Sequence, residues 1–352
     1  MADAWMVYGA YGYTGRLVLE RAVAAGLKPV VAGRDAARIE SLALEFGLPH
    51  RSFDLDNTEQ LRRGLEGMRA VLHCAGPFSA TAAPMIAACL QVGTHYLDIT
   101  GEIDVFAYAH ANDGAARKRG VALVPGVGFD VVPTDCLAAM LKHELPDATE
   151  LVLAFDAGGG PSRGTALTSV EGLGNGGRVR RDGQLLKVPL GYKQREFAFP
   201  RGNRQAVTIP WGDVYTAFVS TGIPNVEVYM ALPPRTIANL RRLRWFTPLL
   251  GLAPVQWLMK WRVESSVRGP SAQRRGDTQS HVYGEVRNPR GDVRAATLST
   301  PNGYDLTADA ALAITRHLAT DPGPHAGYYT PSLLMGAEFV RSLPGVQYAR
   351  IR

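Results

Sequence analysis

The sequence predicts an α/β protein: a Rossmann-type, doubly wound parallel sheet with an inserted mixed α+β substrate domain. Two observations favour this fold class. Up to about residue 145, strand-like and helix-like segments alternate regularly, which is the pattern of βαβ units in a parallel sheet. After residue 150 the segments become short and alternate between polar and apolar residues, which is typical of an antiparallel or mixed sheet.

The parallel domain is predicted from alternating strand and helix patterns. Its strands are expected at 4–10, 28–33, 50–54, 70–75, 95–99 and 121–125. Its helices are expected at 14–25, 36–46, 58–66, 80–92, 103–119 and 134–144. Because right-handed crossovers bring the carboxyl ends of such strands to one edge, the loops that follow the strands should line a ligand crevice.

The inserted domain should contain several short strands and a helix after residue 160. The helix is expected in "SRGTALTSVEGLGNGG", and "NPRGD" has the composition of a hairpin turn. The strands are expected in "REFAFP", "QAVTIPW", "VYTAFVS", "VEVYMAL", "SHVYGEV" and "VRAATLST". Two last helical patterns, "DLTADAALAITRHLA" and "TPSLLMGAEFVRSL", are expected to pack on the first domain. Residues 1–130 and 300–352 are therefore predicted to form the dinucleotide-binding domain, and residues 131–299 a substrate or dimerisation domain.

A glycine-rich loop, "GAYGYTG", separates the first predicted strand from the first predicted helix. Glycine permits a tight turn and a close approach of the backbone to a pyrophosphate, which then rests on the N–H groups of the helix start. The glycine spacing is G-x-x-G-x-x-G rather than the usual G-x-G-x-x-G. The position of the loop between a strand and a helix therefore indicates dinucleotide binding more strongly than its spacing does. The predicted cofactor-binding residues of this loop are Gly9, Tyr11, Gly12, Tyr13, Thr14 and Gly15.

The end of the second strand indicates which cofactor is bound. Proteins that bind NAD usually place a carboxylate about 20 residues after the glycine loop to hold the ribose 2′-hydroxyl. Here Arg34 takes that position, and a guanidinium can pair with a 2′-phosphate instead. Asp35 is better interpreted as the N-cap of the following helix, and Arg38 lies one turn further on. The sequence therefore favours NADP(H).

The composition is that of an ordinary soluble globular chain of two domains. The three cysteines lack metal-ligand spacing and suit the core of a cytoplasmic protein, and no metal site is predicted. The first strand follows Met1 closely, so no signal peptide is expected. The formal charge of +6 is concentrated between Arg235 and Arg275, which holds nine basic residues and one acid. Because the basic residues form a local patch and the sequence contains no nucleic-acid-binding motif, nucleic acid is not expected as a partner.

One apolar segment does not fit the α/β pattern. Residues 245–259 are uncharged and mostly apolar, lie between Arg244 and Lys260, and have tryptophans near both ends. A transmembrane helix needs about 20 apolar residues, and two prolines interrupt this segment. Basic flanks and tryptophans suit peripheral membrane contact through 241–262. A lid over an acyl substrate, a homodimer interface and ordinary core are the alternatives.

Several loops together resemble one family. "GAYGYTG", "VAGRD", "CAGPF", "HYLDITGE" and "PGVGFDVVPTD" look like the saccharopine-dehydrogenase-like NADP-binding oxidoreductases, and "VRGPSAQRRG" and "YYTPSLLMGAEFV" fit the same group. Within it, the chain is most similar to the trans-acting enoyl reductases of lipid and polyketide synthesis. One departure is Tyr11, where the family more often has threonine.

The resemblance implies NADPH as hydride donor and a substrate domain inserted between the two ends of the chain. It also places Ala75, Gly76, Pro77 and Phe78 at the cofactor, with Phe78 against the nicotinamide face. The expected substrate is an unsaturated acyl thioester, free or carrier-bound, or a related lipidic intermediate. An imine reductase acting on an amino acid is the alternative, which would need cationic groups such as Arg163, Arg178, Arg180 and Arg181. A non-catalytic, lipid-associated nucleotide-binding protein is a second alternative.

The predicted catalytic residues lie on the crevice loops. In "HYLDITGE", Tyr96 and Asp98 share one face of a strand and could point together toward the nicotinamide. Asp130 follows "GVGF" in the next loop. Helix capping is the alternative role for Asp98, Glu102 and Asp130, and a structural role is favoured for His95.

Overall fold

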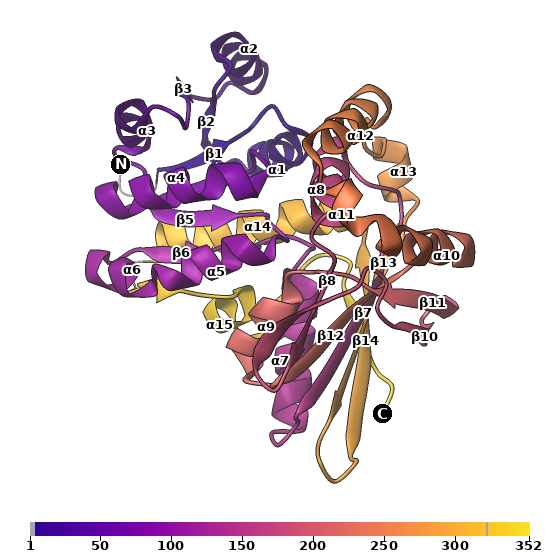
Figure 1. Ribbon diagram of the computed structural model, residues 1–352. Helices are drawn as coiled ribbons and strands as arrows, with labels where there is room; N and C mark the ends of the chain where they lie inside the picture. The colour runs from indigo at the N-terminus through magenta and orange to yellow at the C-terminus, as the bar shows by residue number, and fades with distance from the viewer. Residues whose placement is uncertain (1–3, 322) are drawn as a thin grey trace. The chain divides into compact units, whose positions relative to one another are not determined.

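The computed structural model describes residues 4–321 and 323–352, and the chain divides into two compact units (Figure 1). The first unit comprises Met1–Val132 and Tyr304–Met335. The second comprises Pro133–Gly303 and Gly336–Arg352. A parallel sheet organises the first unit and a mixed sheet the second, which confirms the predicted fold class.

The sheet of the first unit has the strand order β15-β6-β5-β4-β1-β2-β3, and all of its pairs are parallel. Its strands are β1 (Trp5–Tyr8), β2 (Val30–Gly33), β3 (His50–Ser52), β4 (Ala70–His73), β5 (His95–Asp98), β6 (Ala122–Val124) and β15 (Gly327–Tyr328). β1, β4 and β5 are buried at every residue, as expected of central strands covered on both faces. From β1 the chain proceeds to β2 and β3 on one side of the sheet, and from β4 it proceeds to β5 and β6 on the other side. The switch point of the sheet therefore lies between β1 and β4.

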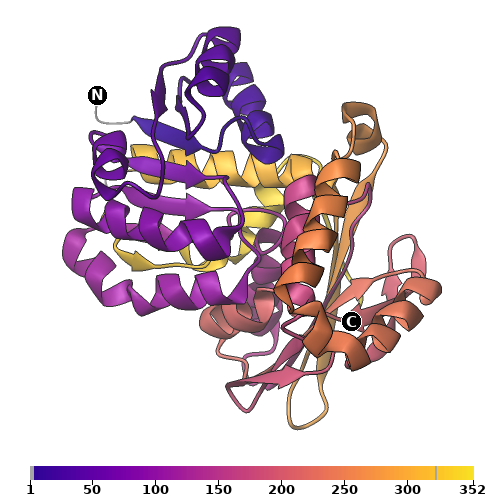
Figure 2. The same ribbon diagram turned by 45° about the horizontal axis from the view of Figure 1, so that its top comes forward.

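Helices connect these strands as the crossovers of βαβ units (Figures 1 and 2). The predicted helix over 103–119 is divided at Asn112, which ends one helix and begins the next. The helices are α1 (Tyr13–Ala24), α2 (Ala36–Phe46), α3 (Thr58–Leu65), α4 (Phe78–Val92), α5 (Ile103–Ala111), α6 (Asp113–Arg119), α14 (Gly303–Thr320) and α15 (Pro331–Met335).

The second unit is built on a nine-stranded mixed sheet. Its main path is β10-β11-β12-β7-β13-β14-β16, while β8 pairs with β12 and with β9. Only the β7–β12 pair is parallel among the described pairs of this sheet. The strands are β7 (Glu150–Asp156), β8 (Gly177–Arg181), β9 (Gln184–Val188), β10 (Gln194–Phe199), β11 (Gly202–Thr208), β12 (Asn225–Ala231), β13 (Gln279–Arg287), β14 (Val293–Pro301) and β16 (Gln347–Arg350).

The helices of the second unit include a consecutive group, from α10 to α13, that precedes β13. They are α7 (Val132–Glu144), α8 (Arg163–Leu173), α9 (Asp213–Thr221), α10 (Pro234–Leu243), α11 (Thr247–Leu250), α12 (Ala253–Ser266) and α13 (Ala272–Gly276). Two short 3₁₀ helices, η1 (Arg244–Phe246) and η2 (Ala337–Ser342), complete the set. No described helix has both the length and the apolar composition needed to cross a bilayer.

Two details of the sequence analysis are corrected by the structure. "VYTAFVS" forms helix α9 rather than a strand, because Val214, Ala217 and Thr221 are buried at helical spacing. The chain end was predicted to belong to the first domain, yet β16 pairs with β14 and residues from Gly336 onward lie in the second unit. The composition of an edge strand does not reveal its partner, which is set by tertiary pairing.

Candidate functional site

The glycine loop leaves β1 at the switch point of the parallel sheet and contacts the loop that follows β4. Gly9 has φ +80°, and a Cβ atom there would lie 2.7 Å from the backbone nitrogen of Ala75. A Cβ atom at Gly15 would lie 2.5 Å from the carbonyl oxygen of Gly9. These two glycines therefore allow the close packing of strand, turn and helix that brings backbone N–H groups to a phosphate.

Gly12 has a different environment from its two neighbours. It is the extended N-cap residue of α1, and a Cβ atom there would meet only the Gly9 carbonyl oxygen at 3.0 Å and the Cys74 carbonyl oxygen at 4.0 Å. Among residues 4–321 and 323–352, no side chain caps α1, and the first turn of the helix contains no acidic residue. The helix start can therefore receive an anion.

The tyrosines of the loop pack against neighbouring elements of the same unit. The ring of Tyr11 lies close to Gly33: a Cβ atom at Gly33 would lie 2.9 Å from the ring. The Arg38 guanidinium lies 5.8 Å from the centroid of the same ring. Tyr13 packs edge-on against Tyr304 of α14 with ring centroids 4.9 Å apart. Tyr11 thus fills the space between the glycine loop and the end of β2.

Arg34 lies directly after β2 and its side chain is exposed. Asp35 caps α2, as predicted: its carboxylate accepts the backbone N–H of Arg38 at 3.1 Å and pairs with the Arg38 side chain at 3.3 Å. The carboxylate next to Arg34 in the sequence is therefore committed to the helix, while the Arg34 side chain is exposed. This arrangement suits a 2′-phosphate better than a free 2′-hydroxyl.

The loop after β4 is held by a residue whose partners the sequence analysis did not identify. Glu102 accepts two backbone N–H groups with its two carboxylate oxygens, that of Phe78 at 3.0 Å and that of Ser79 at 2.7 Å. From the sequence, Glu102 was a candidate proton donor with a local helix cap as the alternative, whereas in the structure it caps the distant helix α4. Its contribution is to fix Ala75–Phe78, the predicted nicotinamide-side loop, at the carboxyl edge of the sheet.

Tyr96 and Asp98 lie together, as the strand pattern predicted. The Tyr96 hydroxyl donates to Oδ2 of Asp98 at 2.6 Å, while Oδ1 accepts the backbone N–H groups of Thr100 at 3.0 Å and Gly126 at 2.9 Å. Both side chains are fully buried, and burial raises the pKa of Asp98 to about 6 despite these hydrogen bonds. Neither side chain offers a surface to a substrate, so we interpret the pair as a clamp between the loops after β5 and β6. A part in proton transfer stays a prediction.

Of the three predicted catalytic residues, Asp130 is the one whose position and pKa suit a proton donor. It lies in the loop after β6, is only partly buried, and its Oδ2 would lie 3.1 Å from a Cβ atom at Gly101. Burial raises the pKa of Asp130 to about 7. A carboxylic acid that titrates near neutral pH is suited to general acid catalysis.

His95 has the structural role expected of it. Its Nδ1 accepts the backbone N–H of Ala122 at 2.9 Å, which ties the start of β5 to β6. Burial lowers the pKa of His95 to about 4, so the ring is neutral at physiological pH. It lies at the amino end of β5, away from the loops that carry the cofactor residues.

Comparison with known proteins identifies the first unit. Residues 5–124 match the family model for the saccharopine dehydrogenase NADP binding domain. This stretch is a saccharopine-dehydrogenase-type NADP-binding domain. The family resemblance and the nicotinamide dinucleotide cofactor predicted from the sequence are thereby confirmed.

Curated relatives share about half of the chain. A saccharopine dehydrogenase-like oxidoreductase of Mus musculus is 27% identical over 202 residues, which are 50% of this chain and 47% of that protein. A protein of Mycobacterium tuberculosis (strain ATCC 25618 / H37Rv), named as a candidate trans-acting enoyl reductase, is 31% identical over 190 residues, which are 48% and 43% of the two chains. The chain therefore spans about half the length of the curated relatives it matches.

A solved structure shows the same fold. The apo saccharopine dehydrogenase (L-Glu forming) of Saccharomyces cerevisiae aligns with 99% of this chain and 100% of its own, at a TM-score of 0.66 and 11% identity. Within the NADP-binding domain of the present chain, the glycine loop would hold the pyrophosphate and Arg34 the 2′-phosphate. The loop from Ala75 to Phe78 would lie beside the nicotinamide.

Proposed function

We propose that the protein is an NADPH-dependent reductase that transfers a hydride to the activated C=C bond of an unsaturated acyl thioester. The observation that carries the proposal is the NADP-binding domain with an exposed Arg34 at the ribose position and a partly buried Asp130 at the same edge of the sheet. Similarity to the Mycobacterium tuberculosis relative supports the enoyl class of substrate.

Reduction of an enoyl thioester requires that the protein orient the substrate and cofactor, exclude water and supply one proton. NADPH, when bound, supplies the hydride for the β-carbon of the thioester. The α-carbon then requires a proton, which a protonated Asp130 can donate because its pKa lies near 7. The products are the saturated thioester and NADP⁺. Asp98 and Tyr96 act in this scheme by fixing the two loops that carry the site.

The imine alternative is less well supported by the positions of the arginines. Arg180 is buried and donates to the carbonyl oxygens of Val214 and Gly183, and Arg181 pairs with Glu227. Arg178 donates to the carbonyl oxygens of Asn175 and Gly177. Three of the four arginines that could hold substrate carboxylates are thus engaged by the protein itself.

The test is NADPH oxidation at 340 nm against a panel of enoyl thioesters of increasing chain length, with imines of amino and keto acids in parallel. Deuteride from the labelled cofactor should appear at the β-carbon of a saturated thioester by mass spectrometry. Turnover of imines alone would replace the enoyl proposal. If NADPH binds and neither panel is reduced, the non-catalytic nucleotide-binding alternative replaces it.

The role of Asp130 has a separate test. Asp130→Asn keeps the size of the side chain and removes the proton, so kcat should fall by about 10²-fold or more while the Kd of NADPH is unchanged. The parent should lose activity as pH rises through about 7, because the acid is then deprotonated. An Asp130→Asn variant with parental kcat and pH profile would assign the proton to another group.

A further inference from the structure

We propose that residues 243–262 form a docking surface for an anionic lipid bilayer. Eight of the fifteen exposed large hydrophobic side chains among the described residues lie in this one stretch. Trp245 is 75% exposed and Trp257 68%. The eight are Leu243, Trp245, Phe246, Leu249, Leu252, Trp257, Leu258 and Trp261. A concentration of this kind marks an interaction site rather than ordinary surface.

The outward direction of these side chains follows from the way α12 packs. α12 lies against α8, both within the second unit (Figures 1 and 2). Its polar residues face α8: Gln256 donates to the Val170 carbonyl oxygen at 3.0 Å, and Lys260 pairs with Glu171 at 2.6 Å. Trp257, Leu258 and Trp261 are exposed, while the half-buried residues of α12 are both polar and apolar. Three large apolar side chains of α12 are thus left in solvent, where a helix in water usually has polar residues.

The charge around the apolar side chains selects the partner. Nine basic residues and one acid lie between Arg235 and Arg275, so the segment has a net charge of +8. Arg241, Arg242 and Arg262 are exposed, and the guanidinium of Arg244 lies 5.0 Å from the ring centroid of Trp245. Apolar side chains that insert between lipids, surrounded by arginines that pair with phosphates, are typical of proteins that bind anionic membranes.

Three other interpretations fit less well. α12 has 14 residues and is about 21 Å long, short of the roughly 30 Å hydrocarbon core, so it lies on a membrane rather than across one. A second copy of the chain would place the same basic surface opposite itself, and like charges would repel. The core alternative considered from the sequence does not hold for α12, where none of the residues is buried, although Leu250 of α11 is buried.

The experiment is co-sedimentation of the full chain with vesicles of phosphatidylcholine alone or with 30% phosphatidylglycerol, the latter as a rough mimic of an anionic membrane. Binding is expected only to the anionic vesicles and should weaken as salt increases. Trp245, Trp257 and Trp261 are exposed whereas Trp5 is buried, so tryptophan emission should shift to the blue on binding. Brominated lipids should quench it.

Variants distinguish the contributions. Trp257→Ser with Leu258→Ser and Trp261→Ser should reduce vesicle binding at least tenfold without changing Tm or the Kd of NADPH, because each of these residues is more than half exposed in the folded protein. Arg241→Gln with Arg242→Gln should cost roughly fivefold per arginine. Leu44→Ser, at a residue 78% exposed on α2, is the matched control. The proposal would be overturned if the triple variant bound anionic vesicles as tightly as the parent. It would also be overturned if the parent did not bind vesicles and the triple substitution instead converted a dimer into a monomer.

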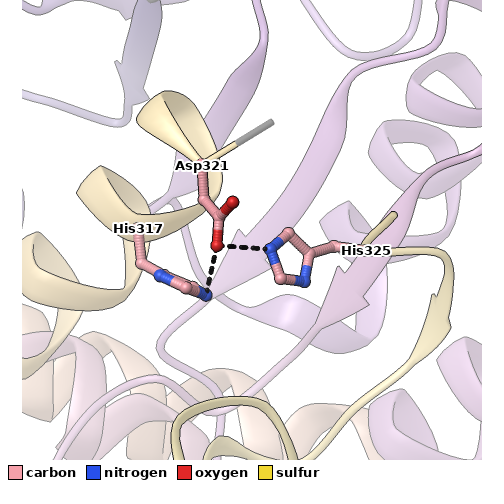
Figure 3. Close-up of side chains that lie close together, drawn as sticks. All are labelled: His317, Asp321 and His325. Atoms are coloured by element: carbon pink, nitrogen blue, oxygen red, sulfur yellow. Dashed lines mark ion pairs between the residues drawn. The ribbon is translucent and has the colours of Figure 1, made fainter. Parts of the chain in front are cut away.

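A second and independent inference concerns the C-terminal end of α14. We infer that His317, Asp321 and His325 form a site for a divalent transition-metal ion such as Zn²⁺. Figure 3 shows the Asp321 carboxylate between the two imidazoles. Its Oδ2 lies 3.1 Å from Nε2 of His325 and 3.7 Å from Nε2 of His317, and the three donor atoms all lie within 4.8 Å of one another. Donors bound to one tetrahedral ion at about 2.0–2.2 Å are separated by similar distances.

The surroundings support a preformed set of ligands. Oδ1 of Asp321 accepts the backbone N–H of Gly323 at 2.8 Å, which orients the carboxylate in the way that outer hydrogen bonds orient metal ligands. Arg69 is engaged by the carbonyl oxygens of Leu318 and Asp321, so its charge does not occupy the space between the imidazoles. The sequence analysis predicted no metal site, because these three ligands cross the end of a helix and match no familiar motif.

The site lies at the amino edge of the parallel sheet, beside a hollow of about 620 Å³. The lining residues precede β4, β5, β6 and β15, whereas the cofactor loops follow their strands. The ion should therefore stabilise the fold rather than take part in hydride transfer. Two imidazoles and one carboxylate leave a fourth position for water.

Calorimetric titration of untagged, EDTA-treated protein with ZnCl₂ should show one ion per chain and a higher Tm on binding. His317→Ala and Asp321→Asn should each weaken binding at least tenfold, while His50→Ala, at an exposed histidine of β3, should not. NADPH affinity should be unchanged by the ion. Absence of a Tm shift, or equal zinc affinity in the parent and the His317→Ala variant, would overturn the inference.

Discussion

Glu102 allows the strongest prediction about how the cofactor loop is held. Its carboxylate accepts the N–H groups of Phe78 and Ser79, two of the unsatisfied donors at the start of α4. Glu102→Ala removes both acceptors, and Glu102→Gln keeps one oxygen in place. A hydrogen bond to a charged group contributes about 1.5–3 kcal/mol, and partial exposure reduces that value. We expect losses of about 2–3 kcal/mol for the alanine variant and about 1 kcal/mol for the glutamine variant.

Urea unfolding followed by circular dichroism measures both losses, and the alanine variant should show a Tm lower by roughly 5–10 °C. NADPH titration by fluorescence should show weaker binding in the same order, because Ala75–Phe78 lose their anchor. Glu40→Ala, at an exposed glutamate of α2, is the control. If Glu102→Ala and Glu102→Gln unfold alike, or if both match the parent within 0.5 kcal/mol, a rough limit for neutral surface changes, the carboxylate does not act as this cap.

The remaining predictions concern the glycine loop, Arg34 and Asp98. Gly12→Val should reduce NADPH affinity at least tenfold, since the side chain would occupy the space of the pyrophosphate. The variant should fold, because its Cβ would meet the Gly9 oxygen at 3.0 Å and the Cys74 oxygen at 4.0 Å. Gly114→Ala in α6 is the control, and parental affinity of Gly12→Val would make the turn purely structural. Arg34→Ala should weaken NADPH binding by roughly tenfold or more and leave NADH binding unchanged; an equal effect on both would move the 2′-phosphate elsewhere. Asp98 holds its proton more tightly in the folded protein, with a pKa of about 6 against 3.8, so it contributes stability at low pH that is lost as pH rises from about 4 to 6. This pH-dependent change in the free energy of unfolding amounts to about 3 kcal/mol. Asp98→Asn should abolish the change, because the amide can donate to the Tyr96 hydroxyl while its oxygen still accepts the two backbone N–H groups. Identical pH–stability curves for the parent and the variant would contradict the shifted pKa.

Local patterns were sufficient to predict the parallel unit. The buried run Trp5–Tyr8, the glycines that follow and the cap at Asp35 are signals within a few residues of one another, and the structure places each as expected. The partners of Glu102 could not be predicted in this way, because they lie 23 and 24 residues away in sequence. The clamp of Tyr96 and Asp98 was half predicted: strand geometry placed the side chains on one face, and only tertiary packing revealed their complete burial.

The second unit was less predictable for a related reason. The residues of α9 alternate β-branched and aromatic types, so a period of two and a helical period both fit the stretch. The apolar segment at 245–259 had four open interpretations, and only the exposure of Trp257 and Trp261 excluded the core for α12. Burial depends on which elements cover a helix, and that information is not local.

The central claim is that the first unit binds NADPH through an arginine at the ribose position. The most direct measurement is the titration of the unmodified protein with NADPH and with NADH, under the same salt, by intrinsic fluorescence. We expect NADPH to bind at least tenfold more tightly than NADH, because Arg34 pairs with the 2′-phosphate and Asp35 is committed to α2. Equal affinities, or tighter binding of NADH, would contradict it.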